Sequence, residues 1–196
     1  MSSVSIASPA STLIPVVVPS LMTAEEFFNQ YENKHAELIK GIVKELPMPS
    51  YKHGYICLKI GRILGSFVEL HDLGRAMSND SFVKVRNNPD SIRGVDLCYI
   101  SYERLPKGEI PEGLLDVVPD LVVEVRSPSN TWIEIFPKVV DYLHCGVRVV
   151  IVLDSPTQTA SVYRPDAMQD TFMPEQELVI PEILPGFSVQ VRKLFE

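Results

Sequence analysis

The sequence predicts an α/β fold with a mixed central β-sheet flanked by helices, and three observations lead to this expectation. Apolar residues recur at helical spacing within residues 50–74. Short apolar or alternating segments typical of strands then dominate the chain, with one further helical segment at residues 130–146 between them. An antiparallel hairpin is expected near residues 148–164, and it makes the sheet mixed.

The first elements are expected to be a short helix and a strand. Thr23 is followed three residues later by Glu26, which is the pattern of a capping box, so a helix is expected to begin there. Residues 36–39 fit a short helix or a turn. Residues 42–46 alternate between apolar and polar side chains, as expected of a strand.

The longest amphipathic helix is expected within residues 50–74, closed by Gly74. Three strands follow it. Residues 81–86 alternate, residues 94–100 form a second strand, and residues 120–125 are apolar enough to be buried on both faces of a sheet.

The next helix lies within residues 130–146. It is expected to be regular only from about Pro137, because proline is tolerated in a first helical turn and not inside a helix. The continuous apolar strand 147–154 and the strand 159–165 would form the hairpin. Residues 187–195 close the chain.

The length of 196 residues favours one domain, expected at residues 21–196. Residues 1–20 carry no positive charge and are interrupted by three prolines, which predicts a mobile or loosely docked N-terminal segment and not a secretory signal. The net charge of -7 argues against a protein that coats nucleic acid through bulk charge.

A membrane location is not expected, since no stretch approaches the roughly 20 apolar residues that cross a bilayer. The cysteine count is odd, at three, and no paired cysteine or histidine spacing suggests zinc. Free thiols in a reducing compartment are therefore expected, which places the protein in the cytoplasm.

Two carboxylates interrupt apolar strands, Asp96 in GVDLCYI and Glu124 in LVVEVRS. We expect them on neighbouring strands with their carboxylates about 4–6 Å apart, where each charge shifts the pKa of the other. Unpaired charges are costly to bury, so each residue either pairs with an arginine such as Arg93 or Arg126 or shares a cation with its neighbour. Mg²⁺, or Mn²⁺ in its place, takes such oxygen ligands.

The segments ELIKGIVKELPMPSYKHG, GVDLCYI and PDLVVEVRSPS resemble the Uma2 family (DUF820), which is similar to restriction-endonuclease-like PD-(D/E)XK phosphodiesterases. The resemblance runs from about Leu21 to the C-terminus. Its most specific part is PDLVVEVRSPS, followed by a lysine at position 138 and by Tyr142, Gly146 and Val147.

The resemblance implies a role for each of five residues. Asp96 takes the place of the aspartate of the motif, Glu124 that of its (D/E) residue, and Glu37 that of a glutamate on an N-terminal helix. These three would bind Mg²⁺ or Mn²⁺ and, with Lys138 in the place of the motif lysine, form the catalytic set. His53 falls where the family usually carries a histidine.

The sequence also departs from the family pattern. Arg126, and not lysine, stands two residues after Glu124; an arginine can stabilise charge but cannot act as a base. Ile42 replaces a glutamate that usually follows the glycine. Pro137 directly precedes Lys138.

Two functions remain open on these grounds. The first is a metal-dependent endonuclease that hydrolyses DNA phosphodiester bonds and acts as a homodimer, so that two sites meet two strands. The second is a module that keeps the nuclease fold, has weakened or lost the chemistry, and serves binding or assembly. A metal titration separates them. The apolar segment 147–154 is either a core strand or the seam of the dimer.

Overall fold

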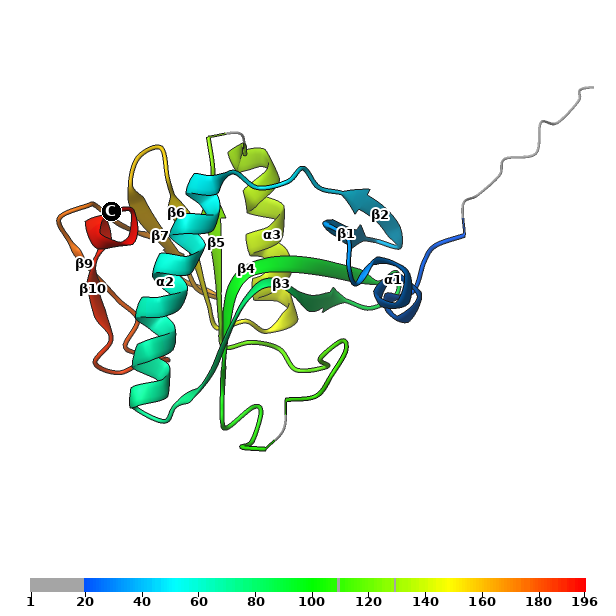
Figure 1. Ribbon diagram of the computed structural model, residues 1–196, viewed down its shortest axis with the longest axis horizontal. Helices are drawn as coiled ribbons and strands as arrows, with labels where there is room; N and C mark the ends of the chain where they lie inside the picture. The colour runs from blue at the N-terminus through cyan, green and yellow to red at the C-terminus, as the bar shows by residue number, and fades with distance from the viewer. Residues whose placement is uncertain (1–19, 109, 129) are drawn as a thin grey trace, which may run out of the picture.

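The computed structural model describes residues 20–108, 110–128 and 130–196 (Figure 1). In this part of the chain a central sheet lies between two long helices, α2 (Tyr51–Leu70) and α3 (Trp132–Cys145). The expected α/β fold with a mixed central sheet and flanking helices is confirmed. Apart from Ser20, the N-terminal segment 1–20 lies outside the described residues.

The central sheet has eight strands, whose path runs β2–β1–β4–β5–β6–β7–β8, with β3 paired to β4. Strands β5 and β6 are parallel, joined through α3, and the other pairs are antiparallel, including the expected β6–β7 hairpin. The strands are β1 (Ala36–Ile39), β2 (Ile42–Glu45), β3 (Gly74–Arg86), β4 (Ser91–Ser101), β5 (Leu121–Arg126), β6 (Val149–Asp154), β7 (Thr159–Tyr163) and β8 (Asp170–Phe172).

Smaller elements complete the fold. Helix α1 (Ala24–Tyr31) begins at the expected capping box, in which the Thr23 hydroxyl accepts the Glu26 N–H. Two strands that the sequence patterns did not indicate separately, β9 (Glu177–Val179) and its partner β10 (Ser188–Gln190), form a second sheet, and a 3₁₀ helix (Val191–Leu194) follows.

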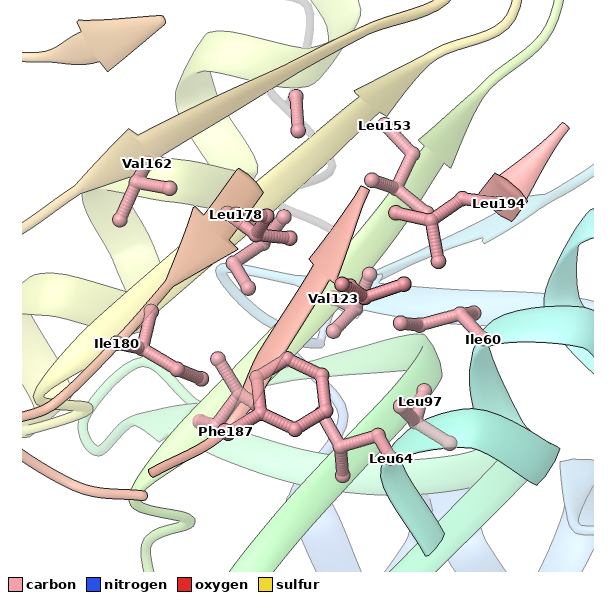
Figure 2. Close-up of a cluster of buried hydrophobic side chains, with 14 of the residues drawn as sticks. Ile60, Leu64, Leu97, Val123, Leu153, Val162, Leu178, Ile180, Phe187 and Leu194 are labelled. Atoms are coloured by element: carbon pink, nitrogen blue, oxygen red, sulfur yellow. The ribbon is translucent and has the colours of Figure 1, made fainter. Parts of the chain in front are cut away.

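Each face of the sheet has its own apolar core. On one face, Ile60 and Leu64 of α2 pack against Leu97 and Val123 of the sheet, and the C-terminal segment with Phe187 closes this core (Figure 2). On the other face, α3 packs its buried side chains onto β4, β5 and β6. The two helices thus bury their apolar stripes on opposite sides of the strands that carry the predicted carboxylates.

Residues 36–39 form strand β1, so the expectation of a short helix or turn there is wrong. The chain turns back at once into β2, with Ile39 paired to Ile42. The two residues between them, Lys40 and Gly41, both have positive φ, at 51° and 77°. Two positive φ values in a two-residue loop are the signature of a hairpin turn whose twist matches that of the strands.

Gly74 does not close α2, which ends four residues earlier at Leu70, but begins β3. A Cβ built at Gly74 would lie 2.2 Å from the carbonyl oxygen of Ile100 on β4. The glycine therefore permits close approach of two strands, and β3 starts seven residues before the expected strand at residue 81.

Helix α3 is regular from Trp132, so the expectation that it would be regular only from Pro137 is wrong. Its first turn is stabilised by Glu134, whose carboxylate accepts the backbone N–H of Thr131 at 2.8 Å. Pro137 lies inside the helix and is exposed to solvent. Packing of the apolar face of α3 outweighs the local cost of the proline.

Replacing Pro137 by alanine is expected to raise the free energy of unfolding by about 1–3 kcal/mol, since proline inside a helix costs about 3 kcal/mol relative to alanine. Urea denaturation followed by circular dichroism measures the change. Pro156→Ala, in the turn between β6 and β7, is the control and should give no such gain. A lower midpoint for Pro137→Ala would mean that the proline ring contributes more through packing than it costs the helix.

All six residues of β6 are buried, and the strand lies inside the sheet between β5 and β7. Within the segment 147–154, residues 149–154 are therefore a core strand, and the use of this strand as a dimer seam is excluded. None of the helices in the described ranges combines the length and the apolar character needed to cross a bilayer.

Candidate active site

The candidate site lies at a gap along one edge of β4. Strand β3 pairs with β4 along its whole length, so β1 and β5 must share the opposite edge. On that edge β1 pairs only at Ile92, and β5 pairs from Leu97 to Tyr99. Residues 93–96 between them have no ladder partner from β1 or β5 within the described chain, which leaves room for side chains to enter.

Lys138 of α3 occupies this gap and lies between two buried glutamates. Its Nζ is 3.0 Å from Glu37 Oε1, on β1, and 3.1 Å from Glu124 Oε2, on β5. It also donates to the carbonyl oxygen of Gly94, on the open edge of β4, at 3.3 Å. Glu37 is 1% exposed and Glu124 is 3% exposed, so one ammonium group offsets the charge of two carboxylates that water barely reaches.

Tyr142 lies one helical turn beyond Lys138 and is fully buried, as helical spacing predicts if the two share a face. Its hydroxyl donates to Glu124 Oε1 at 2.6 Å. Glu124 is therefore held from the same helix by a cation and by a neutral donor, and its orientation is fixed before any ligand arrives.

A second cation, the guanidinium of Arg93, contacts Glu37. Arg93, on the open stretch of β4 and 5% exposed, donates to Glu37 Oε2 at 2.8 Å. It also donates twice to Asp141 Oδ2, through Nε at 2.9 Å and through a terminal nitrogen at 2.6 Å. The site thus contains an arginine that bridges a strand carboxylate and a helix carboxylate.

Asp96 is at the last unpaired position of the gap, next to Leu97, which pairs with Val123. Its Oδ1 lies 3.0 Å from Nε2 of His53, at the start of α2, and its Oδ2 accepts the backbone N–H of Val125 at 2.6 Å. Asp96 and Glu124 are therefore on neighbouring strands, as expected. The side chain of Asp96 is 20% exposed, which makes it the more accessible of the two.

The electrostatics of the cluster follow from its burial. Burial raises the pKa of Glu124 to about 7, because the loss of hydration, together with the charge of Asp96, outweighs the attraction of Lys138. Burial alone would lower the pKa of Lys138, but the charges of Glu124, Glu37 and Asp96 overcome it and raise that pKa. The lysine is held as a cation and is unsuited to act as a base. The hydrogen bond to Asp96 likewise raises the pKa of His53.

The structure brings Glu37, Glu124 and Lys138 into direct contact and sets Asp96 beside them with His53. One correction concerns Glu37, which was expected on a helix and lies on strand β1, because the hairpin turn at residues 40–41 extends this segment along β2.

Arg126 does not join the cluster. Its Nε donates to Asp154 Oδ1 at 3.0 Å, one of its terminal nitrogens donates to the Asn130 carbonyl oxygen at 2.7 Å, and its guanidinium lies over the Trp132 ring. These contacts hold Arg126 at the end of β5. Arg126 supports the turn into α3. Although it follows Glu124 by two residues, it does not contact Glu37, Asp96 or Glu124 through any ion pair or hydrogen bond found in the described structure.

Arg93 is a central member of the cluster, whereas the sequence pattern indicates only an ordinary ion-pair partner. The sequence signal that could have found it is its place three residues before Asp96, inside an apolar strand where a cation is as anomalous as an anion. Asp141 offers a weaker signal, because acidic residues on helices are common.

Replacing Arg93 by methionine is expected to lower the free energy of unfolding by about 3–5 kcal/mol, since removal of one partner leaves buried charge uncompensated. Urea denaturation checks this, with Arg86→Met as the matched control. Arg86 is on β3 and exposed, so its replacement should change stability by less than about 0.5 kcal/mol. Equal midpoints for the two variants would show that Lys138 alone is sufficient to compensate Glu37.

The carboxylate oxygens at the gap are the kind of ligand that a hard divalent cation such as Mg²⁺ or Mn²⁺ takes. Glu37 Oε1 is buried and, apart from its ion pair with Lys138, has no hydrogen-bond donor, so one oxygen in the site retains capacity for a further ligand. Asp96 is partly exposed at the rim. Glu37, Glu124 and Asp96 are the residues that would hold the ion. In the described structure they do not offer three oxygens within 4.8 Å of one another, so an ion would have to draw their side chains together.

Comparisons with known proteins agree with this fold. Residues 24–192 match the Uma2 family, described as "Putative restriction endonuclease". Among solved structures, the fold is similar to a "putative nuclease belonging to DUF820 from Anabaena variabilis ATCC 29413", with a TM-score of 0.78 and 24% identity over 89% of this chain and 97% of that one. At this identity the likeness shows the fold. None of the curated proteins compared with the chain matches it.

Proposed function

The chain belongs to the Uma2 family, and we propose that it is a metal-dependent endonuclease that hydrolyses phosphodiester bonds in DNA. The family description and the nuclease-like fold support nuclease activity. We propose in addition that the activity depends on a divalent metal ion and that the substrate is DNA.

One observation carries the proposal: at the stretch of β4 whose one edge has no ladder partner from β1 or β5 in the described chain, Lys138 pairs with two buried carboxylates and a third lies on the neighbouring strand. Glu37, Asp96 and Glu124 come from three strands, and Lys138 comes from α3. Burying so much charge costs stability, and a fold needs no such cluster in order to hold together. Such a cluster beside the open stretch of β4, inside the sheet, is the arrangement expected of a site that binds a cation and a phosphate.

A divalent ion held by Glu124 and Asp96 would supply Lewis acidity and would lower the pKa of a water molecule towards neutral. The chain's own residues do the rest. Glu124 and Asp96 offer oxygens to the ion, and Glu37 supports them. Lys138 remains an ammonium and offsets the charge that develops on the phosphate. Tyr142 keeps Glu124 oriented through its hydroxyl.

A specific observation also favours the second function, a nuclease-fold module that binds or assembles without cleavage. Lys138 and Arg93 already compensate Glu37 and Glu124, so this part of the cluster is close to neutral without a metal ion. A protein that had lost the chemistry could keep the same contacts as a structural network. The two functions differ in whether the cluster binds a divalent ion at all.

Calorimetric titration with Mn²⁺ tests the proposal. We expect heat from the wild type and none from Asp96→Ala or Asp96→Asn, because the accessible carboxylate is lost in both. Asp116→Ala, which removes an exposed aspartate of the loop before β5, is the control and should behave as the wild type. Equal heats for wild type and Asp96→Ala would place the ion elsewhere. No heat and no cleavage of varied DNA with Mg²⁺ or Mn²⁺ would favour the binding module.

We also propose that the enzyme acts as a homodimer in the cytoplasm. Two copies would present two sites to the two strands of a duplex. The free state of Cys57, Cys98 and Cys145 fits a reducing compartment. Sedimentation analysis with and without duplex DNA would measure the oligomeric state, and a monomer under both conditions would contradict the dimer.

A further inference from the structure

A second group of potential metal ligands lies beside the candidate active site. His53 and Cys57 are one turn apart on α2, and Asp96 faces them from β4. One ligand atom from each of the three lies within 4.8 Å of the others, and no other such group of histidine, cysteine or acidic donors is found in the described ranges. Glu37 and Glu124 are not part of this group.

The donor set differs in kind from the oxygens at the gap. It combines an imidazole nitrogen, a sulfur and a carboxylate, which together suit Zn²⁺ or Co²⁺ better than Mg²⁺. Zinc binds nitrogen at about 2.0–2.1 Å and sulfur at about 2.3 Å, so at the tetrahedral angle these two donors lie about 3.6 Å apart. A bound ion would therefore draw these side chains together by up to about 1.2 Å from their present separation of at most 4.8 Å.

His53 has one paired and one unpaired ring nitrogen. Its Nε2 lies 3.0 Å from Asp96 Oδ1, whereas its Nδ1 is buried and has no hydrogen-bond partner. Buried polar atoms of side chains are nearly always paired, so the unpaired nitrogen shows that the ring is not held by a full set of hydrogen bonds. An ion that His53 and Asp96 share would bind Nε2 in place of the hydrogen bond to Oδ1 and leave the ring proton on Nδ1.

Cys57 is 2% exposed and lies at the edge of the apolar core under α2. As a plain core residue it would gain nothing from two polar neighbours, one a turn away on α2 and one on the facing strand β4. As a ligand it would bind as the thiolate, releasing one proton to solvent for each metal ion bound.

We propose that His53, Cys57 and Asp96 form a binding site for Zn²⁺ that shares Asp96 with the oxygen site of Glu37 and Glu124. Zinc at this position engages Asp96 and competes with Mg²⁺ for it. The site itself is independent of the proposed nuclease function, whereas its consequence, inhibition of cleavage by zinc, rests on that function.

Cobalt is the probe for the site, because a thiolate bound to Co²⁺ gives a charge-transfer absorption band. The reduced wild-type protein is expected to show this band with Co²⁺ and to lose it when Zn²⁺ is added. Cys57→Ala and His53→Gln should lose the band, while Cys98→Ala and Cys145→Ala, which remove the other two thiols, should keep it. Circular dichroism confirms that each variant is folded.

Glu124→Gln separates this proposal from the proposed function. That change removes a ligand of the oxygen site only, so the cobalt band should remain even where Mn²⁺ no longer binds. Absence of the band in the wild type, or its persistence in Cys57→Ala, overturns the zinc site.

Inhibition of DNA cleavage by zinc is tested by a separate measurement. Cleavage with Mg²⁺ is followed as zinc is added, and each protein is normalised to its own rate without zinc. The zinc concentration for half inhibition should rise at least about tenfold in Cys57→Ala. An equal concentration for the two proteins would show that zinc does not inhibit through this site.

Discussion

Glu124→Gln is expected to abolish Mn²⁺ binding and to reduce DNA cleavage by about 10³-fold or more, the largest effect of any single change in the site. Glutamine keeps the shape of the side chain and can still accept the Tyr142 hydroxyl, which lies 2.6 Å from Glu124 Oε1. The change removes the negative charge and, with it, the acceptor for the Lys138 ammonium, which lies 3.1 Å from Glu124 Oε2.

The fold should survive this substitution. Burial already raises the pKa of Glu124 to about 7, so a neutral side chain at this position resembles a state that the wild type itself reaches. Calorimetry and single-turnover cleavage measure the two effects, and Glu45→Gln on the exposed strand β2 is the control. Undiminished Mn²⁺ binding in a folded Glu124→Gln protein would rule out Glu124 as a ligand.

Lys138→Ala is expected to keep Mn²⁺ binding and to lose cleavage by about 10²-fold or more, because the ammonium acts on the charge of the transition state. Lys138→Arg should recover part of the rate, since charge and not proton transfer is its role. Lys193→Ala, at an exposed lysine near the C-terminus, should leave both properties unchanged.

The contacts of Lys138 add a second readout that does not depend on cleavage. Its Nζ lies 3.0 Å from Glu37 and 3.1 Å from Glu124, so alanine leaves two buried carboxylates without the cation between them. The metal-free variant should melt at a lower temperature than the wild type, and Mn²⁺ should raise its melting temperature by more. Full cleavage by Lys138→Ala would move the catalytic cation away from this residue, and Arg126, paired with Asp154, would have to leave its partner to replace it.

The sequence by itself determined the elements whose patterns are long and unambiguous. The helical stripe of α2 and the apolar runs of β5 and β6 are recognisable because side-chain periodicity is a local property of the chain. Asp96 and Glu124 were found for a related reason: a carboxylate inside an apolar strand is anomalous wherever the strand lies.

The structure of short or interrupted segments could not be predicted from local sequence patterns. The four residues of β1 are compatible with a helix, a turn or a strand, and pairing with β2 and β4 decided among them. In α3, the local effect of Pro137 argued against a regular first part, whereas burial of the apolar face on the sheet keeps the helix continuous through it.

Only the tertiary structure decided which charges meet. Lys138 lies between Glu37 and Glu124 because β1 and β5 share one edge of β4 and leave residues 93–96 open, a consequence of strand order and register. The same long-range pairing sets Arg93 behind Glu37 and brings Asp96 to His53 and Cys57. Sequence spacing fixes which residues share an element, but distances between elements depend on how the whole chain packs, and the chemistry of this site depends on those distances.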